Sequence, residues 1–91
     1  MPERTRLPDA DTRALLQQIA ARLIAERPQH PMRESIRTAL VITFAARRHG
    51  YGTARAEHAE EQLLAFAPAV EVGTTRKQYA AELRQAAGGD Q

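Results

Sequence analysis

The chain has 91 residues, carries 13 Lys or Arg against 11 Asp or Glu, and has a formal net charge of +2 at pH 7. This length suits one small domain with one core, so we expect a single all-helical domain over residues 1–91, with frayed ends at about 1–8 and 88–91. Because the sequence contains no cysteine, disulfides and thiolate chemistry are excluded. The charged N-terminal segment and the short apolar runs predict no leader and no membrane span, which favours a cytoplasmic protein.

Apolar periodicity predicts an all-α, four-helix bundle-like fold with helices at about residues 10–27, 32–49, 54–67 and 75–87. The first helix follows Asp9 or Asp11, either of which is a good N-cap. Its apolar face repeats at helical spacing through Leu15, Leu16, Ile19 and Leu23. Pro28 and Pro31 then end the helix, since proline disfavours the helical conformation of the preceding residue.

The second helix, residues 32–49, is apolar all round in its middle, where Leu40, Val41, Ile42 and Phe44 point in every direction. This pattern predicts that neighbouring helices bury it and that it is the central core helix. Its arginines gather within a sector of roughly 100° when residues are stepped around a helical wheel. Gly50 is expected to end the helix.

The third and fourth helices follow short connections. Thr53 is expected to cap the helix at 54–67 after a tight turn, and Pro68 to end it. Thr74 or Thr75 caps the last helix, whose apolar face is thin and consists of Tyr79, Leu83 and Ala86.

Charge is unevenly distributed along the chain, since residues 28–55 have five arginines against Glu34 alone and residues 56–73 have four glutamates and no cation. In one interpretation these arginines pair internally with the glutamates of helix 54–67. In the other they contact phosphates, for which the guanidinium fork is well shaped. The candidate nucleic-acid-binding residues are Arg33, Arg37, Arg47, Arg48 and Arg55. The candidate protein-interaction face on the next helix consists of Glu57, Glu60, Glu61 and Leu64.

Catalytic and metal-binding patterns fail on spacing. His30, His49 and His58 form no metal-ligand pair, and no cysteine supports them. Residues 50–53 lack the Gly-Lys-Ser/Thr ending of a phosphate-binding loop, and Ser35 has no evident His and Asp partners. We therefore expect a protein that is not an enzyme and that uses no cofactor or metal.

These patterns predict an arginine-rich helical protein that binds nucleic-acid backbone without reading sequence, as a subunit or accessory factor of a larger nucleoprotein assembly. Its partners would be nucleic acid and a protein or second copy, with no membrane and no small-molecule ligand. One alternative is a pure protein-interaction module or inhibitor with no nucleic-acid contact.

The second alternative is a helix-turn-helix regulator. Arg33 to Phe44, followed by Gly50-Tyr51-Gly52-Thr53 and a new helix, resembles the opening of tetracycline-repressor-type regulators, in which a first helix ends at a Gly-Tyr turn before a helix-turn-helix. The resemblance implies a DNA-binding recognition helix near residues 75–79, which places Thr75, Arg76, Lys77 and Gln78 toward DNA. This sequence departs from the family in the longer helix at 54–67 and in the break at Pro68.

Overall fold

The computed structural model describes residues 7–88, which form four helices: α1 (Ala10–Ala25), α2 (Glu34–His49), α3 (Ala54–Phe66) and α4 (Arg76–Ala86). The predicted all-α fold is confirmed, and every predicted helix end lies within two residues of the observed one. The fraying predicted for residues 1–6 and 89–91 falls outside the described residues. Within residues 7–88, no helix has the length and apolarity needed to cross a membrane.

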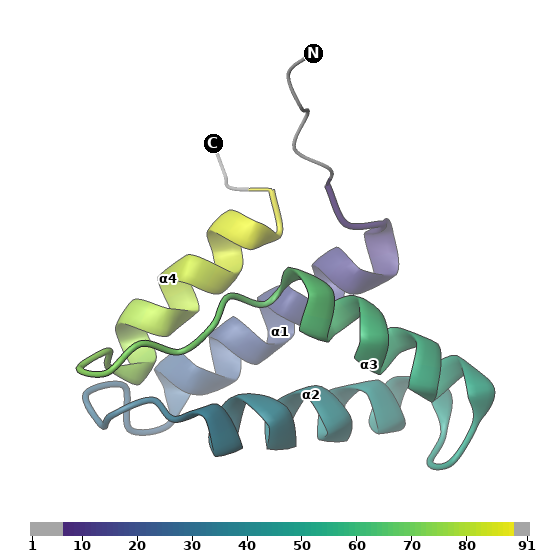
Figure 1. The fold of residues 1–91 in the computed structure, drawn as a ribbon, viewed down its shortest axis with the longest axis horizontal. Coiled ribbons are helices and arrows are strands. Elements are labelled where there is room, and N and C mark those ends of the chain that lie inside the picture. Colours follow the sequence, from purple (N-terminus) through teal and green to yellow (C-terminus); the bar gives the residue numbers. More distant parts are fainter. Residues whose placement is uncertain (1–6, 89–91) are drawn as a thin grey trace.

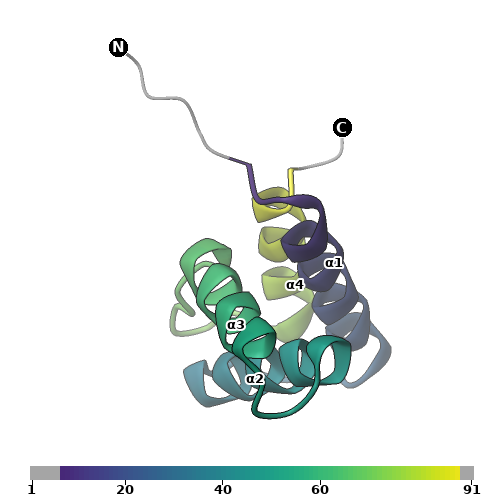
Figure 2. The same cartoon turned by 90° about the vertical axis from the view of Figure 1, so that its right-hand side faces the viewer.

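The helices pack as two pairs. α1 packs most extensively along α4, and α2 packs along α3. Figure 1 shows the chain running down α1, along α2, back through α3 and up α4, so that the start of α1 and the end of α4 lie on the same side of the molecule. Turned by 90°, the pair α2 and α3 lies to one side of α1 and α4 (Figure 2).

The core lies mainly between α1 and α4. The largest side chains that are almost fully buried there are Leu15, Leu16, Tyr79 and Leu83, with Leu63 joining them from α3. Alanines fill much of the remaining contact surface, and their small side chains allow the helix backbones to approach closely. The fully buried ones are Ala20, Ala45 and Ala80. The thin apolar face predicted for the last helix is therefore enough to pack α4 against α1, because buried alanines extend it.

The prediction that the second helix is the central core helix is wrong. Only Val41, Ala45 and Ala46 of α2 are buried, while Leu40 and Phe44 are half-buried and Ile42 is 45% exposed. The reason is that α4 packs on α1 rather than on α2, which leaves one side of α2 open to solvent. An apolar pattern on all sides therefore does not guarantee neighbours on all sides.

Three of the four helices begin at a side-chain cap. The Thr12 amide donates to Asp9 Oδ1 at 2.8 Å, and the Ala56 amide donates to the Thr53 hydroxyl at 3.1 Å. Thr75 caps α4 in a capping box with Gln78, in which each backbone amide donates to the other residue's side chain. The expected caps Asp9, Thr53 and Thr75 are thus confirmed. By contrast, α2 begins at Arg33, whose side chain makes no capping bond.

The two long connections pair with each other. Pro31 and Thr75 form an isolated antiparallel bridge, and the Met32 amide donates to the Thr74 carbonyl at 2.8 Å. The amides of Arg76 and Lys77, in the first turn of α4, donate to the carbonyls of His30 and Pro28 at 2.9 and 2.8 Å. We call residues 27–33 and 71–77 together the loop end, which lies at the left of Figure 1.

Candidate nucleic-acid interface

Arg37 is engaged inside the fold. Its guanidinium donates to the carbonyls of Leu64 and Ala67 at 3.1 and 2.9 Å and to Glu34 at 2.8 Å. Only 12% of its side chain is exposed. Because the last carbonyls of a helix have no partner within it, Arg37 supplies the bonds that the end of α3 needs. Its guanidinium is therefore already in use, although the sequence grouped it with the phosphate-binding candidates.

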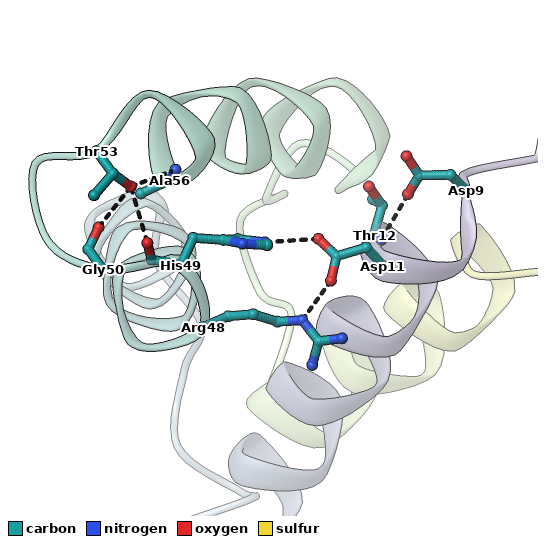
Figure 3. A network of polar contacts seen from close by, with 8 residues as sticks. All are labelled: Asp9, Asp11, Thr12, Arg48, His49, Gly50, Thr53 and Ala56. Carbon is teal, nitrogen blue, oxygen red and sulfur yellow. Dashed lines mark hydrogen bonds and ion pairs between the residues drawn. The ribbon is translucent and has the colours of Figure 1, made fainter.

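Arg48 and His49 are tied to α1. Arg48 Nε forms an ion pair with Asp11, and Asp11 Oδ2 lies 2.8 Å from His49 Nε2, so one carboxylate holds both residues (Figure 3). We call these three residues the Asp11 clasp. The clasp joins the end of α2 to the start of α1, and it neutralises a carboxylate that would otherwise repel an anion nearby.

The remaining three candidates of the predicted arginine set are exposed, and no ion pair within residues 7–88 engages them. Arg47 and Arg55 lie near the α2–α3 turn, whereas Arg33 lies at the opposite end of α2. At 1.5 Å per residue, the length of α2 separates these two sites by roughly 20 Å. The structure therefore divides the predicted arginine stripe between two ends of the molecule.

The alternative candidates at the start of α4 also differ in whether their side chains are available to a ligand. The side chains of Thr75 and Gln78 are used in the capping box, and Arg76 is half-buried with its Nε enclosed. Lys77 is exposed. Because the loop carbonyls and the capping box already bond the first amides of α4, this helix start offers no free amides to a phosphate. Any anion contact here depends on side chains.

The pairing of the two loops brings candidates from both predicted sets together. Arg33 of the first set lies at the loop end with Arg76 and Lys77 of the alternative set, and Arg27 joins them as an exposed fourth cation. The carboxylates nearest in sequence are Glu26 and Glu34, which pair with Arg22 and Arg37, and Glu71. Arg27 was not a sequence candidate. Only the observed loop pairing, in which the Lys77 amide donates to the carbonyl of the adjacent Pro28, brings this part of the chain to the start of α4.

Local helix chemistry at the loop end departs from what stability favours. The positive end of the helix dipole favours acidic residues in a first turn, yet α4 begins with Arg76 and Lys77 and has no acidic residue there. The N-cap of α2 is Arg33, although Ser, Thr, Asp and Asn are the favoured caps, and the acidic residue of this helix start is Glu34 in the first turn. Departures of this kind are expected where a site serves a function rather than the fold.

The predicted protein-interaction face lies on the outer side of α3. Glu57 and Glu61 are exposed, Leu64 is 39% exposed, and Glu60 is half-buried. No ion pair in the described part of the chain joins these glutamates to an arginine of α2. The α2 arginines that do pair internally use Glu34 and Asp11 instead.

Two hollows flank the Asp11 clasp. The first, of about 560 Å³, is lined by residues of α1 and α2 that include Gln18, Phe44 and Arg47. The second, of about 400 Å³, lies toward α3 and is lined by Arg55, His58 and Gln62 among others. Over residues 7–88, no three His, Asp or Glu side chains converge as metal ligands would.

Comparison with known proteins returned no match to the chain among protein-family models, curated proteins or solved structures.

Proposed function

We propose that this chain is a non-catalytic protein that binds the phosphate backbone of nucleic acid through the loop end, as an accessory subunit of a cytoplasmic nucleoprotein assembly. One observation carries the proposal: pairing of the two loops gathers Arg27, Arg33, Arg76 and Lys77, two of them in the first turn of α4 and one at the start of α2. The exposed residues of this group supply most of the contact.

The proposed contact is electrostatic and independent of sequence. Guanidinium groups bind phosphate oxygens through two parallel donors, and each neutralised phosphate releases counterions. The loop end contains no Phe, Tyr or Trp, so we expect charge rather than base stacking to dominate the contact there. Double-stranded nucleic acid is the favoured target, because its phosphate charge is denser along the axis than that of one strand.

The test compares two double variants with the same change in charge. Arg33→Asp/Lys77→Glu alters the loop end, and Arg13→Glu/Arg84→Glu removes two exposed cations near the other ends of α1 and α4. Fluorescence anisotropy with a labelled DNA duplex is measured over a range of salt concentrations. We expect the loop-end variant to bind at least about tenfold more weakly and to lower the slope of log K against log salt by about 2.

Two results would contradict the proposal. Equal loss in both variants would mean that overall charge, not the loop end, governs binding. Absence of duplex binding by the wild type at about 50 mM salt would favour the pure protein-interaction module. A third variant, Arg47→Glu/Arg55→Glu, tests the rival surface at the α2–α3 turn. If only this variant lost duplex affinity, the duplex would bind at that turn and not at the loop end.

A further inference from the structure

Tyr51 is the most exposed aromatic residue of the described chain. It is 75% exposed and occupies the turn between α2 and α3, whereas Tyr79 is buried and Phe44 and Phe66 are half-buried. This turn lies at the opposite end of α2 from the loop end (Figure 1). Exposing a large aromatic ring forgoes the stabilisation that its burial would give.

The turn that carries Tyr51 is held in one conformation. Gly50 and Gly52 on either side have φ values of 97° and 76°, which favour glycine. The Thr53 hydroxyl accepts from the Ala56 amide and lies 3.0 and 2.9 Å from the carbonyls of His49 and Gly50 (Figure 3). A fixed turn presents the ring without the entropy cost of ordering it on binding.

The charges around the turn favour an anionic partner. Asp11 forms an ion pair with Arg48 and a hydrogen bond with His49, and Asp9 accepts the Thr12 amide. The exposed Arg47 in the last turn of α2 and the exposed Arg55 in the first turn of α3 have no ion pair inside residues 7–88. The first turn of α3 also has one exposed carboxylate, that of Glu57. An exposed aromatic ring with an exposed guanidinium group four residues away on either side in the sequence is a combination of the kind that binds single-stranded nucleic acid.

We infer that the Tyr51 ring stacks on an unpaired nucleobase while Arg47 and Arg55 contact the phosphates beside it. The ligand class is single-stranded nucleic acid, or an unpaired end or loop of a longer one. This contact is separate from the loop end, which has cations but no Phe, Tyr or Trp and suits a duplex.

The experiment titrates wild type, Tyr51→Ala and Tyr51→Phe with a short labelled oligothymidylate. Tyr51→Ala should weaken binding by about 5-fold to 150-fold, the range expected for loss of one stacked base. Tyr51→Phe should keep most of the affinity, because stacking needs the ring and not the hydroxyl. Replacing Arg47 and Arg55 by Gln should lower the salt dependence. Circular dichroism checks that each variant remains folded, as expected for an exposed side chain.

A control titration with duplex DNA separates this inference from the proposed function. Tyr51→Ala should leave duplex affinity unchanged, and Arg33→Asp/Lys77→Glu should weaken the duplex far more than the oligothymidylate. Two results would overturn the inference. In the first, the wild type does not bind the oligothymidylate, which is the result expected if Tyr51 contacts a protein instead. In the second, Tyr51→Ala binds the oligothymidylate as well as the wild type does. Loss of duplex binding with retained, Tyr51-dependent single-strand binding would instead overturn the proposed function alone.

Discussion

The guanidinium of Arg37 caps the C-terminal end of α3. It donates to the carbonyls of Leu64 and Ala67, which lie 27 and 30 residues further along the chain. The sequence placed Arg37 on the same side of a helix as Arg33, but Arg33 has an extended backbone and precedes the first residue of α2. The sequence also could not reveal that Arg37 faces the end of α3 while Arg33 faces solvent. For single residues, the sequence predicts the helix face, while the tertiary neighbours decide whether a charge is available to a ligand.

Replacing Arg37 by alanine should therefore lower stability. The variant leaves the carbonyls of Leu64 and Ala67 without their donor, which should cost about 1–3 kcal/mol of unfolding free energy. Urea denaturation measures this difference. Arg33→Ala is the matched control, because replacing an exposed arginine that has no ion pair within residues 7–88 should change stability by less than about 0.5 kcal/mol. Equal effects in the two variants would refute the structural role of Arg37.

A second prediction for a single residue concerns Tyr79 and the dependence of stability on pH. Its hydroxyl donates to the Pro68 carbonyl at 2.5 Å, and burial raises its pKa above the ordinary value of 10.0. The unfolded chain therefore loses this proton first as pH rises, so the stabilisation is complete below pH 10 and is lost as pH rises through the folded-state pKa. Urea denaturation between neutral and strongly alkaline pH should show this loss in the wild type. Tyr79→Phe should be less stable at neutral pH and should lack this part of the alkaline decline.

Among the elements, helix existence was predictable because caps and breakers are local. Asp9, Thr53, Thr75 and Pro68 mark helix boundaries in the sequence and do so in the structure. Which helices pair is a long-range property, so neither the packing of α4 on α1 nor the exposure of Ile42 could be read from periodicity. The loop end was missed for the same reason, since its two segments are separated by the whole of α2 and α3.

The loop pairing predicts unusual amide protection. First-turn amides of a helix normally have no partner and exchange rapidly with solvent. In α4, the amides of Arg76 and Lys77 bond to loop carbonyls, whereas Ala54 and Arg55 at the start of α3 have no such partner among the described residues. Hydrogen exchange followed by NMR should show slower exchange for Arg76 and Lys77 than for Ala54 and Arg55. Similar rates in both pairs would mean that the loops are not joined in solution.

At the start of α2, we expect a residue that favours nucleic-acid binding to lower the stability of the fold. Arg33→Asp supplies a favoured N-cap and removes a cation from the positive end of the helix dipole, which should add about 0.5–1 kcal/mol of stability. For a domain of this size, that corresponds to a rise in melting temperature of roughly 2–8 °C. Calorimetry measures the rise. If the variant melts at a lower temperature than the wild type, Arg33 supports the fold, and its loss of binding would no longer isolate a ligand contact.

At the scale of the whole molecule, α2 separates two surfaces with different chemistry. The loop end has cations from both loops and from two helix starts, and the opposite turn has the exposed Tyr51 with an exposed arginine in each of the two adjoining helices. The Asp11 clasp and the loop pairing hold these surfaces in fixed positions on one small core. Such an arrangement suits a protein that holds a duplex near a single-stranded segment within a larger assembly.

Duplex binding by the loop end is tested most directly by titrating the isotopically labelled protein with a short DNA duplex and recording amide chemical shifts by NMR. We expect the largest changes in residues 27–33 and 71–77, and we expect them to diminish as salt is raised. Changes centred on the glutamate face of α3, or no changes at low salt, would contradict this proposal.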